Sequence, residues 1–246
     1  MLCPSCNREI PEQPGLIFCP YCGWKTTPEP PKSCPWEERE SLGFITAVTS
    51  TLKESLLKPG EFFRKMPVTG GIGSPLIYAM IWGTLGMMFA VVWQILSGGM
   101  FEMIARPPGM KHEFGPEYLL ALAVLSPLFV IMGLFIGSGI LHLCLMLIGG
   151  NKKGFEATFR VVSYSYGAQI FSAIPFCGGF IGAIWMIVIE IIGFKEAHGI
   201  SGGKAALAIF LPLIFCCVLA AIFIAIMIPL ILGALGSIPY LKGIPI

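Results

Sequence analysis

The chain has 246 residues and a formal net charge of +2, and only 12% of its residues are charged. Hydrophobic residues make up 55% of the chain, and its mean hydropathy is +0.80. A soluble domain of this size has no interior large enough to bury so much apolar surface. The small net charge argues against nucleic acid or an acidic substrate as a partner. We therefore expect an all-α membrane protein that contacts the lipid bilayer and binds no nucleic acid.

Two cysteine pairs open the chain, as Cys3-Pro-Ser-Cys6 and Cys19-Pro-Tyr-Cys22. Each Cys-x-x-Cys pair can place two thiolates on one metal ion, and four thiolates complete the closed, tetrahedral coordination of structural zinc. Iron also suits four thiolates, whereas disulfides are disfavoured on the cytoplasmic side of a membrane. Residues 1–24 are therefore predicted to form a non-catalytic zinc ribbon, and Cys34 has no role in it.

Residues 25–40 contain four prolines among charged residues, which is typical of an extended, poorly packed linker. An amphipathic helix is predicted next, because Phe44, Val48, Leu52 and Leu56 recur every four residues. Aromatic and cationic residues then follow at 62–65, a combination that suits the membrane interface. We assign residues 41–66 to an interfacial helix, which can also pack on the membrane domain.

Five apolar stretches follow and predict transmembrane helices across a hydrocarbon core about 30 Å thick. They lie at Ser74–Leu96, within Leu119–Ile148, at Thr158–Ile174, at Phe180–Phe194 and within Ala205–Leu235. The third is the least apolar. The last contains two prolines, so one kinked helix and one broken helix are both open. Residues 74–235 are thus predicted to be a five-helix transmembrane domain preceded by the interfacial helix and the ribbon.

The distribution of Lys and Arg predicts the orientation. Eight of these residues flank the predicted spans on the side of the N-terminus and three on the opposite side. Cytoplasmic segments carry the excess of Lys and Arg. We therefore expect a cytoplasmic N-terminus and, in a prokaryote, a location in the inner membrane.

Glu190 is the most prominent polar residue in the predicted spans, where a carboxyl group is costly unless it is paired, protonated or facing water. One interpretation is a group that lines a pore or binds an ion or a proton. The other is that Glu190 lies near the cytoplasmic end of its helix and pairs with Lys195 or Lys204.

Further candidate residues lie in the second and third spans. In the third, Tyr164, Tyr166 and Gln169 serve either hydrogen bonding between helices or a polar conduit. His142, in the second span, is either a buried, hydrogen-bonded histidine or a metal ligand.

Two patterns that resemble catalytic motifs are incomplete. The sequence Ser201-Gly202-Gly203-Lys204-Ala205 lacks the earlier glycine and the hydroxyl of a phosphate-binding loop. Ser138 lies near His142, but no set of groups for nucleophilic catalysis can be identified around them. The sequence therefore predicts a protein without enzymatic activity.

The octapeptide Pro59-Gly60-Glu61-Phe62-Phe63-Arg64-Lys65-Met66, placed between the amphipathic stretch and the spans, resembles bacterial members of the Yip family. Other matching positions are Tyr164, Pro175, Gly178, Trp185, Gly193, His198, Ser201, Lys204, Ala205 and Pro212. The resemblance covers residues 41–235 and leaves the ribbon as a fused addition. It implies five helices, a cytoplasmic N-terminus and no catalytic residues.

The Yip family is named for interaction with Ypt/Rab GTPases. Its eukaryotic members carry an Asp-Leu-Tyr-Gly-Pro motif ahead of the first span, which this sequence lacks. The resemblance therefore supports the fold more than a GTPase partner. The leading hypothesis is a self-associating scaffold whose ribbon meets a cytoplasmic protein. The alternative is an oligomeric ion channel or small-molecule transporter lined by the third and fourth spans, and a lipid-handling role is a third.

Overall fold

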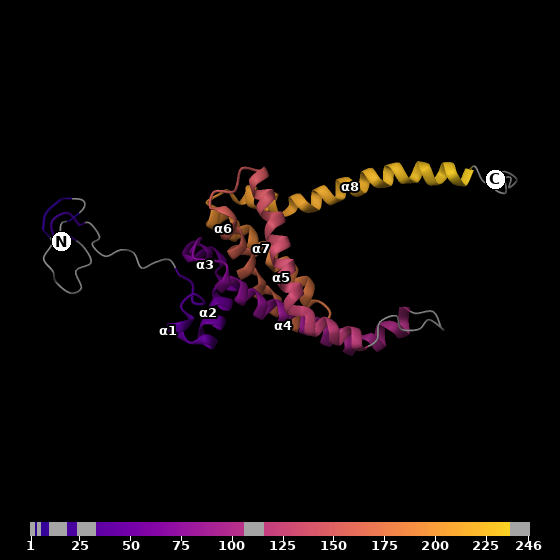
Figure 1. The fold of residues 1–246 in the computed structure, drawn as a ribbon, viewed down its shortest axis with the longest axis horizontal. Coiled ribbons are helices and arrows are strands. Elements are labelled where there is room, and N and C mark those ends of the chain that lie inside the picture. The colour runs from indigo at the N-terminus through magenta and orange to yellow at the C-terminus, as the bar shows by residue number, and fades with distance from the viewer. Residues whose placement is uncertain (1–2, 4–5, 10–18, 24–32, 106–115, 237–246) are drawn as a thin grey trace.

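The computed structural model describes residues 3, 6–9, 19–23, 33–105 and 116–236. Among these residues the regular elements are helices, without a β-strand (Figure 1), which confirms the predicted all-α class. Three short helices come first, α1 (Arg39–Leu42), α2 (Phe44–Leu57) and α3 (Pro59–Lys65). The long helices are α4 (Gly73–Ala105), α5 (Pro116–Leu147), α7 (Gly178–His198) and α8 (Gly202–Gly236), with α6 (Gly154–Ser165) and the 3₁₀ helix η1 (Tyr166–Ala173) between α5 and α7.

Four helices in the described part of the chain are long and apolar enough to cross a membrane. The candidate segments are Gly73–Ser97, Glu117–Leu147, Gly178–His198 and Gly202–Leu230. They correspond to the first, second, fourth and fifth predicted spans. The last segment is one continuous helix that contains both Pro212 and Pro229, so the alternative of a broken helix is not observed.

The third predicted span has a different form. The α-helical turns of α6 tighten into the 3₁₀ turns of η1 at Tyr166, and neither helix is long enough to count as a span by itself. Every residue from Ala157 to Ser165 is buried by protein. Polar side chains are tolerated here because other helices, rather than lipid, surround them. A fifth membrane crossing therefore stays a prediction.

Glycines allow η1 to lie close against α4 on one side and α7 on the other. A Cβ added to Gly86 would come within 2.9 Å of the Gln169 Cβ, and one added to Gly182 within 2.9 Å of the Ala168 carbonyl oxygen. Larger side chains would push both helices away from η1. Gly86 and Gly182 are therefore used for packing within the chain.

Pro127 lies inside α5, where it offers no N–H to the carbonyl of Ala123 one turn earlier. The Ser126 hydroxyl donates to that carbonyl at 2.7 Å instead. A free carbonyl is costly in a bilayer, and a neighbouring hydroxyl removes that cost. Because the Ser126 hydroxyl replaces the missing backbone donor, α5 continues as one helix.

The predicted amphipathic helix exists, and Val48, Leu52 and Leu56 of its apolar face pack on the main hydrophobic core. Gly43, with φ of +80°, separates α1 from α2. Phe44 and Ile45 are exposed, whereas the buried residues of α2 are Ala47, Val48, Thr51 and Ser55. Thr51 is buried beside this face, where it accepts a hydrogen bond of 2.8 Å from the backbone N–H of Trp36. One face of α2 therefore packs on protein, while apolar side chains remain exposed on another.

The predicted linker is also packed where the structure describes it. Its boundary at residue 40 stays a prediction, but the expected poor packing is wrong for residues 33–38. Cys34 and Trp36 are buried in the main hydrophobic core together with residues of α2, α4 and α6. The proline content of the preceding residues gave no indication of this docking.

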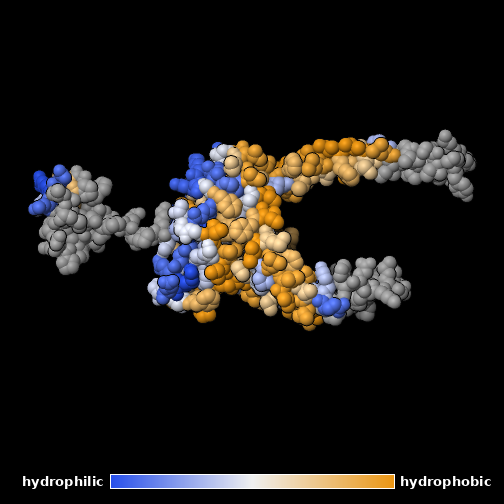
Figure 2. Space-filling model, in the orientation of Figure 1, coloured by the Kyte–Doolittle hydropathy of each residue, from blue (hydrophilic) through white to orange (hydrophobic). Residues whose placement is uncertain are grey.

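α8 lies apart from the other helices over most of its length (Figure 1). None of its most apolar window is buried inside the protein, whereas 28%, 17% and 33% of the corresponding windows of α4, α5 and α7 are buried. Figure 2 shows a hydrophobic surface over α8 and the far part of α4, and hydrophilic residues gathered where α1, α2 and α3 lie. The described residues thus form a polar end, with apolar helices projecting from it.

Candidate functional site

The four cysteines of the predicted ribbon lie together. Their sulfur atoms are all within 4.8 Å of one another. The Cys3 and Cys22 sulfurs are 3.6 Å apart, and those of Cys6 and Cys19 are 3.8 Å apart. Sulfurs at the corners of a tetrahedron with Zn–S bonds of about 2.3 Å are separated by about 3.8 Å. The spacing therefore fits one tetrahedral metal ion held by four thiolates.

The two knuckles repeat the same backbone turn. The N–H of Asn7 donates to the Cys3 carbonyl at 2.8 Å, and that of Gly23 donates to the Cys19 carbonyl at 2.9 Å. Both residues follow the second cysteine of a pair and have left-handed backbones, with φ of +56° and +70°. Asparagine and glycine tolerate this conformation best. Asn7 and Gly23 therefore have equivalent roles in the two knuckles.

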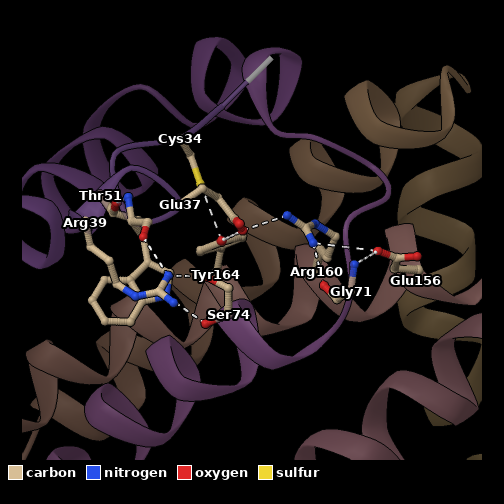
Figure 3. A network of polar contacts seen from close by, with 10 residues as sticks. Cys34, Glu37, Arg39, Thr51, Gly71, Ser74, Glu156, Arg160 and Tyr164 are labelled. Atoms are coloured by element: carbon tan, nitrogen blue, oxygen red, sulfur yellow. Dashed lines mark hydrogen bonds and ion pairs between the residues drawn. The ribbon is translucent and has the colours of Figure 1, made fainter. Parts of the chain in front are cut away.

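A second group of polar residues lies at the polar end of the helices, and we call it the Arg160 cluster (Figure 3). It consists of Cys34, Glu37, Glu156, Arg160 and Tyr164. Three of these residues are spaced by four along α6, so their side chains lie along one face of that helix. The other two come from the segment that precedes α1. The cluster therefore joins α6 to the chain that leads from the ribbon.

Arg160 is fully buried and makes strong contacts with its terminal nitrogens. Nη2 lies 2.6 Å from Glu37 Oε1, and Nη1 donates to the Gly71 carbonyl at 2.6 Å. Glu156 Oε1 is 3.7 Å from Nη1 and accepts from the Gly71 N–H at 2.6 Å. A buried guanidinium is tolerated only when it is paired and hydrogen-bonded. Nε is buried without a partner among the described residues.

The cluster contains a directed chain of hydrogen bonds. The Cys34 thiol donates to the Tyr164 hydroxyl at 3.4 Å, and that hydroxyl donates to Glu37 Oε1 at 2.6 Å. The carboxylate charge therefore attracts both the phenol proton and the guanidinium of Arg160. The pKa of the Cys34 thiol is raised to about 11, mainly by burial and to a smaller extent by the nearby Glu37 charge. Cys34 is thus a neutral donor at physiological pH.

Trp36 holds the same segment from the other side. It is fully buried, its indole Nε1 donates to the Ser74 carbonyl at 2.7 Å, and its ring packs against Tyr78. The Arg39 guanidinium lies 5.0 Å from the centre of the indole ring and donates to Ser74 Oγ at 2.8 Å. These contacts attach the segment before α1 to the start of α4.

His142 belongs to a chain of four side chains that join α5, α6 and α7. Asn151 Nδ2 lies 3.3 Å from His142 Nε2, and His142 Nδ1 lies 3.1 Å from the Thr158 hydroxyl. That hydroxyl is also 3.1 Å from His198 Nε2. Because the amide of Asn151 donates, His142 donates to Thr158, and Thr158 donates to His198. The geometry fits the interpretation of His142 as a hydrogen-bonded residue, although the side chain is half-buried rather than buried.

Glu190 is buried in α7, with 6% of its surface exposed, and its Oε1 lies 3.0 Å from the Ser165 hydroxyl. The expected pairing with Lys195 or Lys204 is wrong, since Glu190 has no cationic partner among the described residues. Lys195 is 3.2 Å from Glu196 instead. Position on the helix explains the difference, because Glu190 faces α6 rather than the polar end.

The other two candidates of the third span lie in η1 and are placed by packing. A Cβ added to Gly83 would meet the Tyr166 ring at 2.9 Å, and Gln169 lies against Gly86. Gln169 also accepts from the Ser172 hydroxyl at 3.4 Å. The structure does not bring these two side chains together with His142, and a functional role for any of the intramembrane candidates stays a prediction.

Sequence reasoning missed the Arg160 cluster. The spacing of Glu156, Arg160 and Tyr164 was visible as a four-residue repeat. Arg160 was instead counted among the charges that flank the spans, and its principal partner Glu37 lies 123 residues earlier in the chain. The absence of a lysine or an arginine beside Glu37 in sequence left no local signal for the pair.

The apolar helices and their buried polar contacts define a polytopic α-helical membrane protein with an N-terminal four-cysteine cluster. The family model described as the Yip1 domain matches residues 53–225. This match covers more than half of the chain, so the protein belongs to the Yip1 domain family, and the resemblance read from the sequence is confirmed. The bacterial type stays a prediction. No curated protein and no solved structure gives a match.

Removing the metal is expected to unfold the ribbon and leave the helices intact. A segment this small has no apolar core of its own, and its folding free energy comes from metal binding. Amide NMR signals of residues 6–9 and 19–23 should collapse on chelation, while the helical circular dichroism is unchanged. Cys22→Ser should abolish metal binding, and Cys177→Ser should not. Ribbon signals that persist in metal-free protein would refute the structural role.

Glu37→Ala is expected to destabilise the docked segment by about 2–4 kcal/mol, because it leaves the buried Arg160 with a weaker set of partners. The readout is the alkylation rate of Cys34, followed by mass spectrometry at pH 8. The native thiol should react slowly, since it is buried and protonated, and the variant should react at least tenfold faster. The control is Glu40→Gln, an exposed residue of α1. Equal Cys34 reactivity in the native protein and in Glu37→Ala would contradict this role of the ion pair.

Proposed function

We propose that this protein is a non-enzymatic membrane scaffold that binds a second copy of itself through α8. Its ribbon holds zinc and meets a protein partner in the cytoplasm. The observation that carries the proposal is the complete exposure of the most apolar part of α8 inside the single chain. The part of a helix that has no protein neighbours in one copy is available to a neighbour in another.

The residues of α8 suit close contact between helices. Cys217, Ala221 and Ala225 recur at intervals of four and therefore lie along one face of the helix. Small residues let two helix backbones approach, and association in a bilayer depends on such packing because lipid is as apolar as the side chains. The other three candidate spans already use part of their surface within the chain.

The Arg160 cluster gives the ribbon a fixed point of attachment. Residues 33–38 are docked by a buried ion pair and a buried tryptophan, so the ribbon is tethered next to the polar end of the helices. A closed four-cysteine zinc site leaves no coordination position for a substrate. This combination favours presentation of a binding surface over catalysis.

Disulfide crosslinking in native membranes tests the proposed contact. With Cys216 replaced by serine, the remaining Cys217 should form dimers readily on mild oxidation. With Cys217 replaced, Cys216 should crosslink at least fivefold more slowly, since it lies about 100° around the helix. Ala221→Leu should weaken the association, whereas Leu219→Phe on the opposite face should not. Monomers in every variant would refute self-association through α8.

A second function, an oligomeric ion channel or small-molecule transporter, is supported by Glu190. Among the described residues, the buried carboxyl group of Glu190 has the Ser165 hydroxyl as its one hydrogen-bond partner, and such a group is costly in a membrane protein and often has a functional role. The close packing of η1 against Gly86 and Gly182 favours the scaffold, because it fills the space beside the polar residues of the third span.

Ion flux into sealed liposomes distinguishes the two functions. The scaffold predicts no flux through the native protein under proton, sodium or potassium gradients, and no effect of Glu190→Gln. The channel predicts flux that this substitution changes at least severalfold, because it removes a titratable group of the pathway. Ser201→Ala, near the start of α8, is the control. Ion flux that Glu190→Gln changes would refute the scaffold function and support the channel.

A further inference from the structure

Two hollows share part of the α2 surface. The first has a volume of about 450 Å³ and lies between α2 and α3. The second has a volume of about 300 Å³ and is bounded by α2, η1 and α7. Lys53 and Leu57 contribute to both, so the hollows adjoin at the last turns of α2. These volumes are typical of small-molecule sites, which range from about 300 to 1,000 Å³.

The first hollow suits an anion. Its lining consists of Ser50, Lys53, Glu54, Leu57, Lys58, Glu61, Phe62 and Lys65. Lys58 lies 3.8 Å from Glu61, whereas Lys53 and Lys65 form no ion pair with any described residue. Both of these ammonium groups are exposed and long enough to turn toward a shared ligand. A phosphate group is the chemistry that two such lysines and a nearby serine hydroxyl recognise.

The second hollow suits a hydrocarbon chain. Apart from Lys53 and Thr49, its lining is Leu52, Leu56, Leu57, Phe171 and Trp185. The Trp185 indole Nε1 donates to the Leu56 carbonyl at 3.2 Å, which satisfies its polar atom and fixes the ring. The ring therefore offers its apolar surface to the hollow.

The surroundings of α2 fit a membrane interface. Phe44, Ile45 and Leu57 on this helix are 53%, 72% and 70% exposed, although they are apolar. Lysines and polar residues lie on the same helix and on α3. A helix with both kinds of exposed side chain lies where headgroups meet acyl chains. The hollows consequently open where a lipid molecule is the most abundant amphiphile.

We propose that the paired hollows bind one anionic phospholipid. Its phosphate lies against Lys53 and Lys65 in the first hollow, and one acyl chain lies along Leu56, Phe171 and Trp185 in the second. A soluble anion would use the first hollow alone, and a neutral amphiphile the second alone. Only an anionic amphiphile matches both hollows, because Lys53 lines each of them and can contact a headgroup whose acyl chain lies in the second. This site is independent of self-association through α8.

Native mass spectrometry of the full chain in detergent tests the site, with phosphatidylglycerol as the probe. The comparison lipids are phosphatidylcholine and diacylglycerol of the same chain length, and the comparison anion is inorganic phosphate. The native protein should bind phosphatidylglycerol roughly tenfold more tightly than phosphatidylcholine, because the lysines select net negative charge. Inorganic phosphate at micromolar concentration should not displace it.

Two variants test the two hollows separately. Lys53→Gln/Lys65→Gln should weaken phosphatidylglycerol binding roughly tenfold, to the level of phosphatidylcholine. Lys153→Gln/Lys204→Gln removes the same charge from exposed positions outside the hollows and should leave binding unchanged. Thr49→Trp should fill the apolar hollow and weaken both phospholipids about equally. Its control is Thr46→Trp, at an exposed position of the same helix outside both hollows.

Circular dichroism and thermal unfolding of each variant show whether the fold is retained, and all of these substitutions are at exposed positions. Equal binding of phosphatidylglycerol and phosphatidylcholine by the native protein would reduce the site to ordinary lipid contact and overturn the proposal. Tight binding of inorganic phosphate would replace it by a soluble-anion site. Unchanged affinity in the lysine variant would overturn the assignment of the headgroup.

Discussion

The need to satisfy one buried arginine organises the polar end of this protein. Arg160 is inaccessible to water and cannot lose its charge. Glu37 must therefore be brought from the segment before α1, and the Gly71 carbonyl from the loop before α4. Three parts of the chain that are far apart in sequence are fixed together by a single guanidinium. If any one of them moved away, an unpaired buried charge would result, which costs several kcal/mol.

The same requirement explains why the least apolar segment lies innermost. The polar side chains of α6 and η1 find partners in neighbouring protein, as Ser165 does with Glu190 and Thr158 does with His198. A lipid-facing position would leave those groups without partners. The glycines of α4 and α7 let these helices enclose η1 at close range, so that lipid is left in contact with apolar helices. The family assignment fits this arrangement, since the matched region includes all of these elements.

The sequence was informative where the signal is local. The cysteine spacing predicted the metal cluster, and apolar length predicted five spans, four of which are candidate spans in the structure, because thiolate geometry and bilayer thickness act within one segment. It failed where the decisive contact is distant. Trp36 and Glu37 follow a proline-rich stretch and were assigned to a linker. They are nevertheless packed on the helices, because Trp36 donates a hydrogen bond to the Ser74 carbonyl and Glu37 pairs with Arg160. The packing face of α2 was predicted in part: Val48, Leu52 and Leu56 contact the core as expected, whereas the burial of Thr51 depends on its hydrogen bond to docked Trp36.

α8 differs from the rest of the molecule in the origin of its stability. Its backbone hydrogen bonds are internal and its side chains are apolar, so it is stable in lipid without protein neighbours. Packing within the chain does not constrain its middle, in contrast to α7, which contacts α3, α6 and η1. The side chains in the middle of α8 are not needed for packing within the chain, and its small residues Cys217, Ala221 and Ala225 lie along one face. The two ends of the described helical region thus differ: residues 33–38 are fixed to the bundle by a buried ion pair, whereas most of α8 has no protein neighbours within the chain.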